Sequence, residues 1–274
     1  MEIKHKVAVI TGGGSGIGAA LARVLANSGA KVVVSDLDLA KAENVASEFG
    51  GVAIQADVAK EDHIIRLIDE ATIHAGPIDI FCSVAGLAFG EPSHSGSASN
   101  EAWQTCWDVH VMSHVYAART LLPSMIERKQ GYFVNVASAA GLLSQIGDAA
   151  YSTTKHAAVG FAESLAITHG VDGIGVSVIC PQYVATPMLG LDEPNEVQRG
   201  SGIISADEVA ECIRDGIENE RFLILPHEEV REYMLVKAKD TDHWIGGMRK
   251  LREKIIAQVG STKLEDMYKM FRGK

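Results

Sequence analysis

The sequence predicts an α/β protein built on a doubly wound parallel sheet of seven strands, with helices on both faces. Three observations lead to this fold class. Seven short runs are nearly continuous in Val and Ile, which is typical of strands that are buried on both faces. Segments long enough for a helix separate these runs, as the crossovers between parallel strands require. Neither an internal repeat nor a low-complexity tract interrupts this order.

The expected elements alternate along the chain. The β-branched runs place strands at 7–10, 31–35, 52–55, 78–82, 132–136, 176–180 and 222–225. The segments between them place helices at 17–28, 39–49, 60–75, 100–128, 150–169 and 206–219. Right-handed crossovers of this kind give a doubly wound sheet. One domain, 1–274, with its core at about 5–226, accounts for the chain.

The segment after the last strand, about 227–274, is expected to add a helical extension. It is mixed in charge, and its apolar residues recur at helical spacing: Val230, Tyr233, Met234, Trp244, Met248, Leu251, Ile255 and Val259. This pattern predicts one or two amphipathic helices. Three placements stay open for them: packing on the body of the same chain, contact with another subunit, or a lid over the functional site.

The composition is that of a globular protein with an acidic surface. Of 274 residues, 47% are hydrophobic and 22% are charged, so disorder is not expected. The 25 Lys and Arg against 35 Asp and Glu give a net charge of −10, which disfavours nucleic acid and anionic membranes as partners. No apolar stretch reaches the roughly 18 residues of a membrane span. Residues 1–6 show no signal peptide and the cysteines form no CxxC pair, so we expect a cytoplasmic protein with reduced cysteines.

A glycine-rich turn leaves the first strand and opens the first helix. It reads Thr11-Gly12-Gly13-Gly14-Ser15-Gly16-Ile17-Gly18. Such a turn lets a pyrophosphate approach the backbone, where free N–H groups and the helix dipole stabilise its charge. Its position between a strand and a helix favours a dinucleotide site over a plain tight turn. The expected contacts with the cofactor are Thr11, Gly12, Ser15, Gly16, Ile17 and Gly18.

A carboxylate, Asp36, stands at the end of the second strand. It can accept hydrogen bonds from both hydroxyls of an adenosine ribose, and it would repel a 2′-phosphate. Ser15 and Leu37 flank this region, where a phosphate-binding Arg or Lys would otherwise be expected. The sequence therefore favours NAD over NADP. We also expect Leu37 to contact the cofactor, and Asp57 and Val58 to meet the adenine.

Tyr151 and Lys155 stand four residues apart in an expected helix, so their side chains share one helix face. A phenol with a pKa of about 10 must lose roughly two to three units to act as a base near neutrality. A cation about 4 Å away lowers the pKa of a phenol by about this amount at an effective dielectric constant of about 20. The pair is therefore a candidate for acid–base chemistry, although this spacing also occurs by chance in many helices.

Together these motifs resemble the classical short-chain dehydrogenase/reductase family over roughly residues 5–226. The matching features are the turn at 11–18, Asp36, Asp57, Ala85-Gly86, Ser138, Tyr151 with Lys155, and the stretch 181–188 with Thr186-Pro187. The resemblance implies a Rossmann-type fold and an NAD-dependent oxidoreductase that transfers hydride between a secondary alcohol and its ketone. It also implies a homo-oligomer, a dimer or a homotetramer, formed through the segment 102–122 and the helix of Tyr151.

The resemblance implies roles for individual residues. Tyr151 is the acid/base, Ser138 orients and polarises the substrate oxygen, and Lys155 lowers the pKa of the phenol and holds the nicotinamide ribose. The remaining implied cofactor contacts are Ala85, Gly86, Pro181, Val184 and Thr186. Of these, Val184 and Thr186 would contact the carboxamide of the nicotinamide.

Three positions depart from the family pattern. Ser83-Val84 stands where the family has Asn-Asn, so the amides that brace the central strands are absent, and Gln182 replaces the Gly after Pro181. His110 replaces the catalytic Asn of the next helix. An imidazole donates and accepts hydrogen bonds and titrates near neutrality. His110 therefore either maintains the family's proton relay or weakens it. His110 and His114 also stand four apart, but no third ligand is evident and no metal is expected.

The segments after the fourth, fifth and sixth strands, which line the substrate pocket in this family, are mostly apolar. They offer Leu87, Ala88, Phe89, Ala139, Ala140, Leu142, Gln145, Gln182, Tyr183, Met188, Leu189 and Leu191. The expected substrate contacts are Ser138, Ala140, Gln145, Tyr151, Gln182, Tyr183 and Met188. A neutral, hydrophobic, cyclic or aromatic secondary alcohol or its ketone fits best. Open alternatives are an anionic substrate reached through Arg199 or C-terminal basic residues, a ketone reductase in vivo, and a non-catalytic NAD-binding sensor or partner protein.

Overall fold

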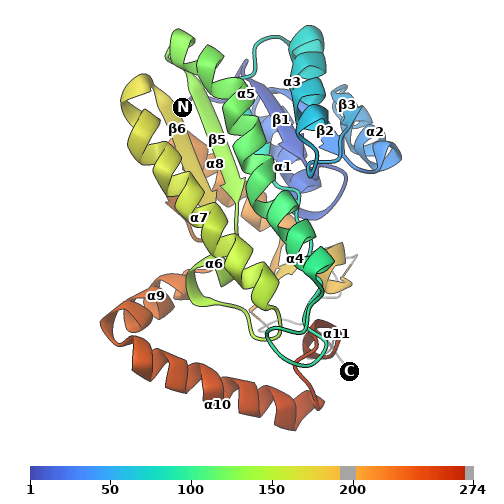
Figure 1. The fold of residues 1–274 in the computed structure, drawn as a ribbon. Coiled ribbons are helices and arrows are strands. Elements are labelled where there is room, and N and C mark those ends of the chain that lie inside the picture. The colour runs from blue at the N-terminus through green and yellow to red at the C-terminus, as the bar shows by residue number, and fades with distance from the viewer. Residues whose placement is uncertain (192–201, 269–274) are drawn as a thin grey trace.

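The computed structural model describes residues 1–191 and 202–268, and it confirms the predicted fold class (Figure 1). Seven parallel strands form one sheet in the order β3-β2-β1-β4-β5-β6-β9. Their bounds are β1 Val7–Thr11, β2 Lys31–Asp36, β3 Val52–Gln55, β4 Ile80–Ser83, β5 Gly131–Val136, β6 Ile174–Ile179 and β9 Leu223–Ile224. Each predicted strand is present, with ends shifted by at most two residues.

Helices cover both faces of this sheet (Figure 1). On one face, side chains of α1 Gly16–Asn27, α2 Leu39–Ser47 and α8 Ala206–Glu218 share a buried cluster with β1 and β2. On the other face, α3 Glu61–Ala75, α5 Ser113–Arg128 and α7 Ala149–His169 form a second cluster with the same sheet. Because both faces are covered, β1 and β5 are buried at every residue. This is the physical reason for their unbroken apolar sequence.

The central strand β1 is the point from which the sheet grows in two directions. It pairs with β2 through Val9 and Val33, and with β4 through Val9 and Phe81. The loops that leave the carboxyl ends of β1 and β4 therefore lead to opposite faces and leave a crevice between them. This edge of the sheet is where a ligand is expected.

One predicted helix, 100–128, is interrupted. It consists of α4 Asn100–Trp107, a π-helical turn at Asp108–Met112, and α5. Turns of this kind are frequent at functional sites. No local pattern marks this one, because its centre, His110, is held by groups from other segments, the N–H of Leu87 and the hydroxyl of Thr154.

The C-terminal extension is helical, as expected, but its described residues form three helices instead of the predicted one or two. These are α9 Glu229–Lys239, α10 Thr241–Val259 and the short α11 Leu264–Tyr268. In Figure 1, α10 crosses the lower end of the molecule, below α6 Ala140–Leu143. A small second sheet, β7 Val184–Ala185 with β8 Ile204–Ser205, is not among the predicted elements.

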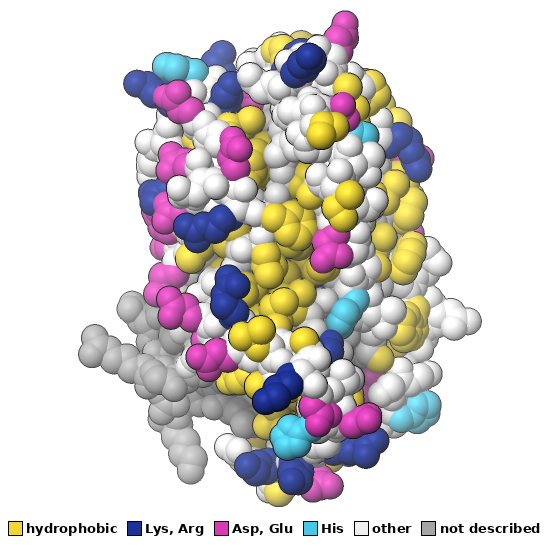
Figure 2. Space-filling model, turned by 90° about the vertical axis from the view of Figure 1, so that its left-hand side faces the viewer, with side chains coloured by type: hydrophobic (Ala, Val, Ile, Leu, Met, Phe, Trp, Pro, Cys, Tyr) yellow, Lys and Arg dark blue, Asp and Glu magenta, His cyan; other side chains and the backbone are white. Residues whose placement is uncertain are grey.

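Apolar side chains also reach the surface. Figure 2 shows the side that lies at the left of Figure 1, where hydrophobic side chains form a band down the middle of the face between charged ones. At the end of α7, Ile167 is 82% exposed, and Val171 just beyond it is 94% exposed. Contiguous apolar surface is typical of contacts between proteins. Of the helices in the described ranges, none combines the length and the apolar character needed to cross a lipid bilayer.

Candidate active site

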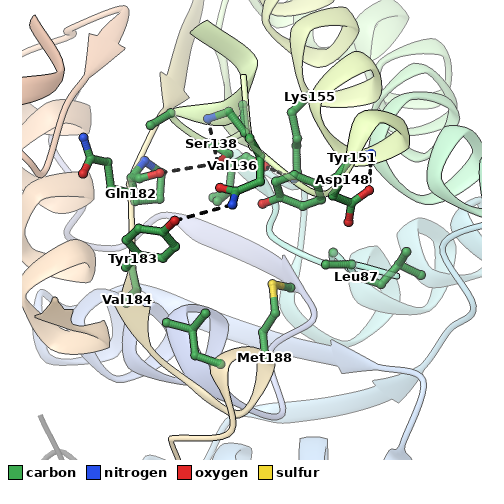
Figure 3. Close-up of a pocket in the computed structure, with 18 of the residues that line it drawn as sticks. Leu87, Val136, Ser138, Asp148, Tyr151, Lys155, Gln182, Tyr183, Val184 and Met188 are labelled. Atoms are coloured by element: carbon green, nitrogen blue, oxygen red, sulfur yellow. Dashed lines mark hydrogen bonds between the residues drawn. The ribbon is translucent and has the colours of Figure 1, made fainter. Parts of the chain in front are cut away.

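A cavity of about 1220 Å³ opens at the carboxyl ends of the strands (Figure 3). It exceeds the roughly 300–1,000 Å³ of a usual small-molecule pocket, so it has room for two molecules side by side. All but two of the predicted catalytic residues and cofactor or substrate contacts line it, the exceptions being Thr11 and His110. The lining ones are Gly12, Ser15, Gly16, Ile17, Gly18, Asp36, Leu37, Asp57, Val58, Ala85, Gly86, Ser138, Ala140, Gln145, Tyr151, Lys155, Pro181, Gln182, Tyr183, Val184, Thr186 and Met188.

The glycine turn brings backbone atoms to one end of the cavity. A methyl group at Gly12, where φ is +65°, would lie 2.7 Å from the Cα of Ala85, and one at Gly18 would overlap the carbonyl of Gly12. Side chains are therefore excluded at both positions. The helix α1 starts directly after Ser15, whose side chain makes no capping bond to its first N–H groups. This helix terminus fits the pyrophosphate of a dinucleotide.

Asp36 lies at the end of β2, beside the glycine turn. Its Oδ2 accepts the N–H of Gly14 at 2.9 Å, and its Oδ1 accepts the N–H of Asp38 at 3.1 Å. A carboxylate accepts about four hydrogen bonds, so each oxygen keeps a lone pair for a ribose hydroxyl. Asp57, farther along the cavity, pairs with Lys60 at 3.3 Å. The residues present at this end therefore fit an adenosine.

Thr11 is predicted to contact the cofactor, but it is buried behind the turn and does not line the cavity. Its hydroxyl donates to the carbonyl of Cys82 at 3.3 Å and accepts the N–H of Val84 at 3.1 Å. These bonds tie the end of β1 to the end of β4. Thr11 thus braces the central strands at the point where the amides of the family pattern are absent.

Ser138 and Tyr151 lie side by side farther into the cavity (Figure 3). Ser138 follows β5, and its Oγ accepts the N–H of Ala140 at 3.1 Å. Tyr151 lies in the first turn of α7. This turn is capped by Asp148, whose Oδ1 accepts the N–H of Tyr151 at 3.0 Å and whose Oδ2 accepts that of Gly90 at 2.8 Å. Asp148 therefore fixes Tyr151 to the loop after β4.

Asp148, which is 1% exposed, is not among the residues predicted from the sequence. An Asp three residues before Tyr151, at the start of a helix, is the local signal of an N-cap. Its second bond, to Gly90, has no local signal, because Gly90 is 58 residues away in the chain.

Burial governs the proton affinities of Tyr151 and Lys155. The Lys155 ammonium donates to the carbonyl of Val136 at 3.0 Å and lies 5.6 Å from the centre of the Tyr151 ring. Loss of water raises the pKa of Tyr151 to about 12, although a hydrogen bond with Ser138 opposes this shift. Burial also lowers the pKa of Lys155 to about 8. The protein groups alone thus do not bring the pKa of the phenol toward neutrality, because desolvation of the phenolate outweighs the hydrogen bond with Ser138.

A family model described as short chain dehydrogenase matches residues 6–196. The match includes the glycine turn, Ser138, Tyr151 and Lys155, and so spans both ends of the cavity. The chain belongs to the short-chain dehydrogenase family. The resemblance seen in the sequence motifs is confirmed, and with it the class of oxidoreductases.

Known proteins similar to this dehydrogenase cover most of its length. The 1-deoxy-11-beta-hydroxypentalenate dehydrogenase of Streptomyces exfoliatus is 32% identical over 241 residues, which are 84% of this chain and 86% of that protein. The mitochondrial borneol dehydrogenase of Lavandula x intermedia is 29% identical, over 90% of this chain and 88% of that protein. A short chain dehydrogenase/reductase from Burkholderia phymatum, solved in complex with NAD, has a TM-score of 0.79 at 28% identity, over 88% of this chain and 96% of that one.

His110 of this dehydrogenase is buried beside the cavity without lining it. Its Nε2 accepts the N–H of Leu87 at 3.2 Å, which places the proton on Nδ1 and makes it the donor to Oγ1 of Thr154 at 2.9 Å. Burial and the Lys155 ammonium hold the pKa of His110 well below its usual range. Both nitrogens are therefore occupied on a neutral ring. His110 thus connects the loop after β4 to α7 through its two hydrogen bonds.

His114, one helical turn farther on, is buried with no hydrogen-bond partner for either ring nitrogen in the described part of the chain. Burial lowers its pKa to about 3, and the Lys155 ammonium adds to the shift. Within residues 1–191 and 202–268, no group of three or more His, Cys, Asp or Glu side chains could hold a metal ion. His114 is thus a buried polar side chain whose ring nitrogens are unsatisfied among the described residues.

We expect His114→Leu to stabilise the dehydrogenase by about 1–3 kcal/mol, because it removes unsatisfied buried polar atoms at similar volume. The wild type should also lose stability as the pH falls below about 6.5. In that range the unfolded His114 takes up a proton, whereas the folded one does so only near its pKa of about 3. The slope is up to about 1.4 kcal/mol per pH unit for this residue. Urea unfolding at about pH 7.5 and about pH 5.5 measures both effects.

The control for this prediction is His74→Leu, which changes an exposed histidine at the end of α3. It should leave the acid sensitivity unchanged. A His114→Leu protein that is less stable than the wild type, or equally sensitive to acid, would contradict the prediction and indicate a bonded or charged His114.

The apolar lining differs in part from the expected substrate segments. Three expected residues do not line the cavity: Phe89 is 53% exposed, Leu142 packs against the core, and Leu191 is buried beside Leu189. Arg199 lies outside the described residues. In their place the C-terminal extension contributes Tyr233, Val236, His243, Trp244, Gly247, Met248, Leu251, Ile255, Leu264 and Tyr268. Two of the three open placements are supported together, since the extension packs on its own chain at Leu143 and also lies over the functional site.

Proposed function

We propose that this dehydrogenase oxidises a secondary alcohol to its ketone with NAD, and that Tyr151 is the acid/base. One observation carries the proposal: a single cavity joins a dinucleotide-binding turn to Ser138, Tyr151 and Lys155. A relative solved with NAD and two relatives named hydroxypentalenate and borneol dehydrogenases support it.

Ser138, Tyr151 and Lys155 then have separate roles in the proposed reaction. When bound, oxidised nicotinamide supplies the hydride acceptor. Tyr151 takes the hydroxyl proton of the substrate at its phenolate oxygen, while Ser138 donates a hydrogen bond to the reacting oxygen. With a pKa of about 12, Tyr151 needs positive charge beside it before it acts as a base, and Lys155 and the oxidised ring are the available sources. In ketone reduction, Tyr151 returns the proton.

The proposed choice of NAD over NADP rests on Asp36. Its carboxylate is held in place by the N–H groups of Gly14 and Asp38, so it would stay close to a 2′-phosphate and repel it. The neighbouring Leu37 is 66% exposed and carries no charge that could neutralise a phosphate.

The proposed substrate is neutral and hydrophobic. Among the described residues that line the cavity, Lys155 is the one Lys or Arg, and its ammonium already donates to Val136. The lining beyond Tyr151 is mostly apolar, with Leu143, Ile146 and Met188 among its residues. An anionic group would find no counter-charge on this lining, whereas a ring or hydrocarbon would replace water there.

Formation of reduced nicotinamide tests the proposed function. The purified protein is mixed with NAD or NADP and a panel of cyclic, aromatic, polycyclic and acidic secondary alcohols, and the absorbance of the reduced ring is followed. Turnover of apolar alcohols with NAD supports the proposal, and faster reduction of the matching ketones favours a reductase. Binding of NADH without any turnover would contradict it and indicate a sensor that keeps the fold.

We also propose that the protein is a homo-oligomer, a dimer or a tetramer. The apolar band in Figure 2 and the exposure of Ile167 and Val171 support an association through an apolar surface. Light scattering of the protein as it elutes from a sizing column measures the mass of the assembly. A monomer at micromolar concentration would contradict this proposal.

His110→Ala is expected to lower kcat by about 10- to 100-fold, because the loop at Leu87 and the helix at Thr154 lose the ring that ties them. His110→Asn should keep most of the rate, since an amide both donates and accepts. Steady-state kinetics and the melting temperature of both variants measure the effect. An unchanged rate for His110→Ala would remove His110 from the active site.

A further inference from the structure

The C-terminal extension carries an apolar face that its own packing leaves uncovered. We call residues 229–268, which contain α9, α10 and α11, the C-terminal arm. Although α10 is 19 residues long, none of its residues is buried. Trp244, Met248, Leu251 and Ile255 recur every three or four residues, so they share one side of the helix, and all four line the cavity. An apolar side of this kind is stabilised when something displaces water from it.

The first end of the C-terminal arm is anchored on α6. Val230 is fully buried in a cluster with Leu143, and the Lys237 ammonium donates to the carbonyl of Leu142 at 2.5 Å. Trp244, at the start of α10, packs on the same cluster. The apolar side of α10 thus begins at a defined point beside the cavity.

The second end of the arm is anchored on the loops that hold α7. Gly147 and Gly90 have φ values of +81° and +70°. A methyl group at Gly147 would overlap the carbonyl of Thr262, and one at Gly90 would lie 3.2 Å from the Cγ of Leu264. Met267 is 3% exposed and packs at the same place. The two glycines therefore leave a notch that the end of the arm fills.

Tyr268 reaches the cavity from this second anchor. It lines the cavity and packs with Tyr183 against Leu189 and its neighbours. Burial raises the pKa of Tyr268, and the phenols of Tyr151 and Tyr183 add to the shift, as expected for three phenols that face a common space. Residues of α10 and α11, from Trp244 to Tyr268, therefore contribute a wall to the cavity that also contains Ser138 and Tyr151.

We propose that the C-terminal arm selects the substrate, and that its wall binds an extended, rigid, apolar alcohol of more than one ring. The inference rests on the function proposed above. A short alcohol held at Ser138 and Tyr151 would leave the side of α10 in contact with water. A larger apolar molecule that extends to α10 would cover it, and this binding energy would favour the larger substrate.

Two leucine truncations within the arm test this proposal. Leu251→Ala removes a side chain that lines the cavity, whereas the matched control Leu235→Ala removes one on α9 that does not. Their exposures of 45% and 65% make unfolding of either variant unexpected. We expect Leu251→Ala to raise KM for a polycyclic secondary alcohol about tenfold with kcat nearly unchanged, and KM for 2-butanol less than about twofold. Leu235→Ala should match the wild type with both alcohols.

A binding measurement separates this proposal from the proposed function. The rise in melting temperature caused by a polycyclic ketone, with NADH present, should be smaller in Leu251→Ala than in Leu235→Ala. If the wild type oxidises neither alcohol, the proposed function fails, and this measurement still decides whether the arm binds apolar molecules. Equal kinetics and equal melting shifts in the two variants would overturn the proposal. So would a changed oligomeric state of Leu251→Ala with unchanged selectivity, because a second copy of the chain would then cover α10.

Discussion

Tyr151→Phe is expected to lower kcat for alcohol oxidation by about 10²- to 10⁴-fold. The substitution removes only the hydroxyl that receives the substrate proton. The ring stays, and with it the edge-on contact with His110, whose centre lies 5.4 Å from that of Tyr151. The Lys155 ammonium donates to Val136 at 3.0 Å and so does not replace the phenol as a base. The initial rate of reduced nicotinamide formation with both substrates saturating measures the loss.

The control for this prediction is Tyr116→Phe, which removes a phenol hydroxyl from α5 outside the cavity. Both variants should bind NADH within about twofold of the wild type, because the glycine turn and Asp36 are unchanged. In the wild type, oxidation should accelerate with rising pH and ketone reduction should slow, since the phenolate is the base and the phenol the acid. A Tyr151→Phe protein with more than about a tenth of the wild-type rate would place the acid/base elsewhere.

Asp36→Ala is expected to reduce the preference for NAD over NADP, measured as the ratio of kcat/KM values, by about 100-fold or more. The variant loses two hydrogen bonds from ribose hydroxyls to a charged group, about 1.5–3 kcal/mol each, and this loss weakens the binding of NAD. Loss of the charge also removes the repulsion that excludes a 2′-phosphate. Kinetics with each cofactor at a fixed concentration of one alcohol measure the ratio.

Asp36→Asn separates the two causes. The amide oxygen of Asn still accepts a hydrogen bond, but the negative charge of Asp36 is gone. The kcat/KM for NADP should therefore rise, while the kcat/KM for NAD should fall less than in Asp36→Ala. Asp38→Asn, at the exposed cap of α2, serves as the control and should leave the ratio unchanged. A ratio that is the same in all three variants would mean that Asp36 only holds the turn through Gly14.

Much of the fold and of the cofactor end of the cavity could be predicted from neighbouring residues. The sheet is covered on both faces, so each strand reads as an unbroken apolar run, and the helices fall between the runs. The glycine turn and Asp36 follow directly from the ends of two strands. Tyr151 and Lys155 share a helix face through their spacing. These features depend on short stretches of chain, and short stretches are what a sequence pattern describes.

Proton affinities and hydrogen bonds between distant segments of the chain could not be predicted in the same way. The spacing of Tyr151 and Lys155 suggested a lowered phenol pKa, but burial raises it to about 12. The π-helical turn around His110 depends on partners in two other segments, Leu87 and Thr154. Both outcomes follow from how much water and which groups surround a side chain, and these depend on segments far away in the sequence.

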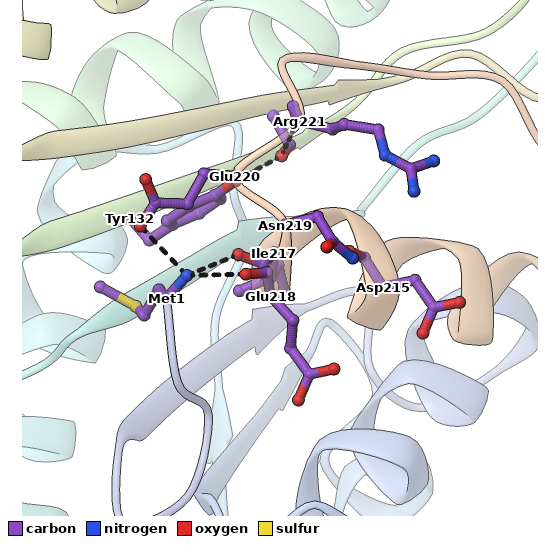
Figure 4. Close-up of polar contacts among 9 residues, drawn as sticks. Met1, Tyr132, Asp215, Ile217, Glu218, Asn219, Glu220 and Arg221 are labelled. Atoms are coloured by element: carbon purple, nitrogen blue, oxygen red, sulfur yellow. Dashed lines mark hydrogen bonds and ion pairs between the residues drawn. The ribbon is translucent and has the colours of Figure 1, made fainter.

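The ends of the chain show this division most clearly. The Met1 ammonium donates to the carbonyls of Ile217 and Glu218, at the end of α8, at 2.9 and 3.2 Å, and it pairs with Glu220 just beyond this helix (Figure 4). The carbonyls at the end of a helix and the helix dipole favour a positive charge there, but no local pattern connects residues 216 apart. The C-terminal arm is similar. Its amphipathic spacing determines that α10 has an apolar side, because periodicity is a property of neighbouring residues. Only the tertiary structure decides that this side lines the active-site cavity, because that placement depends on anchors at α6 and at the notch of Gly90 and Gly147.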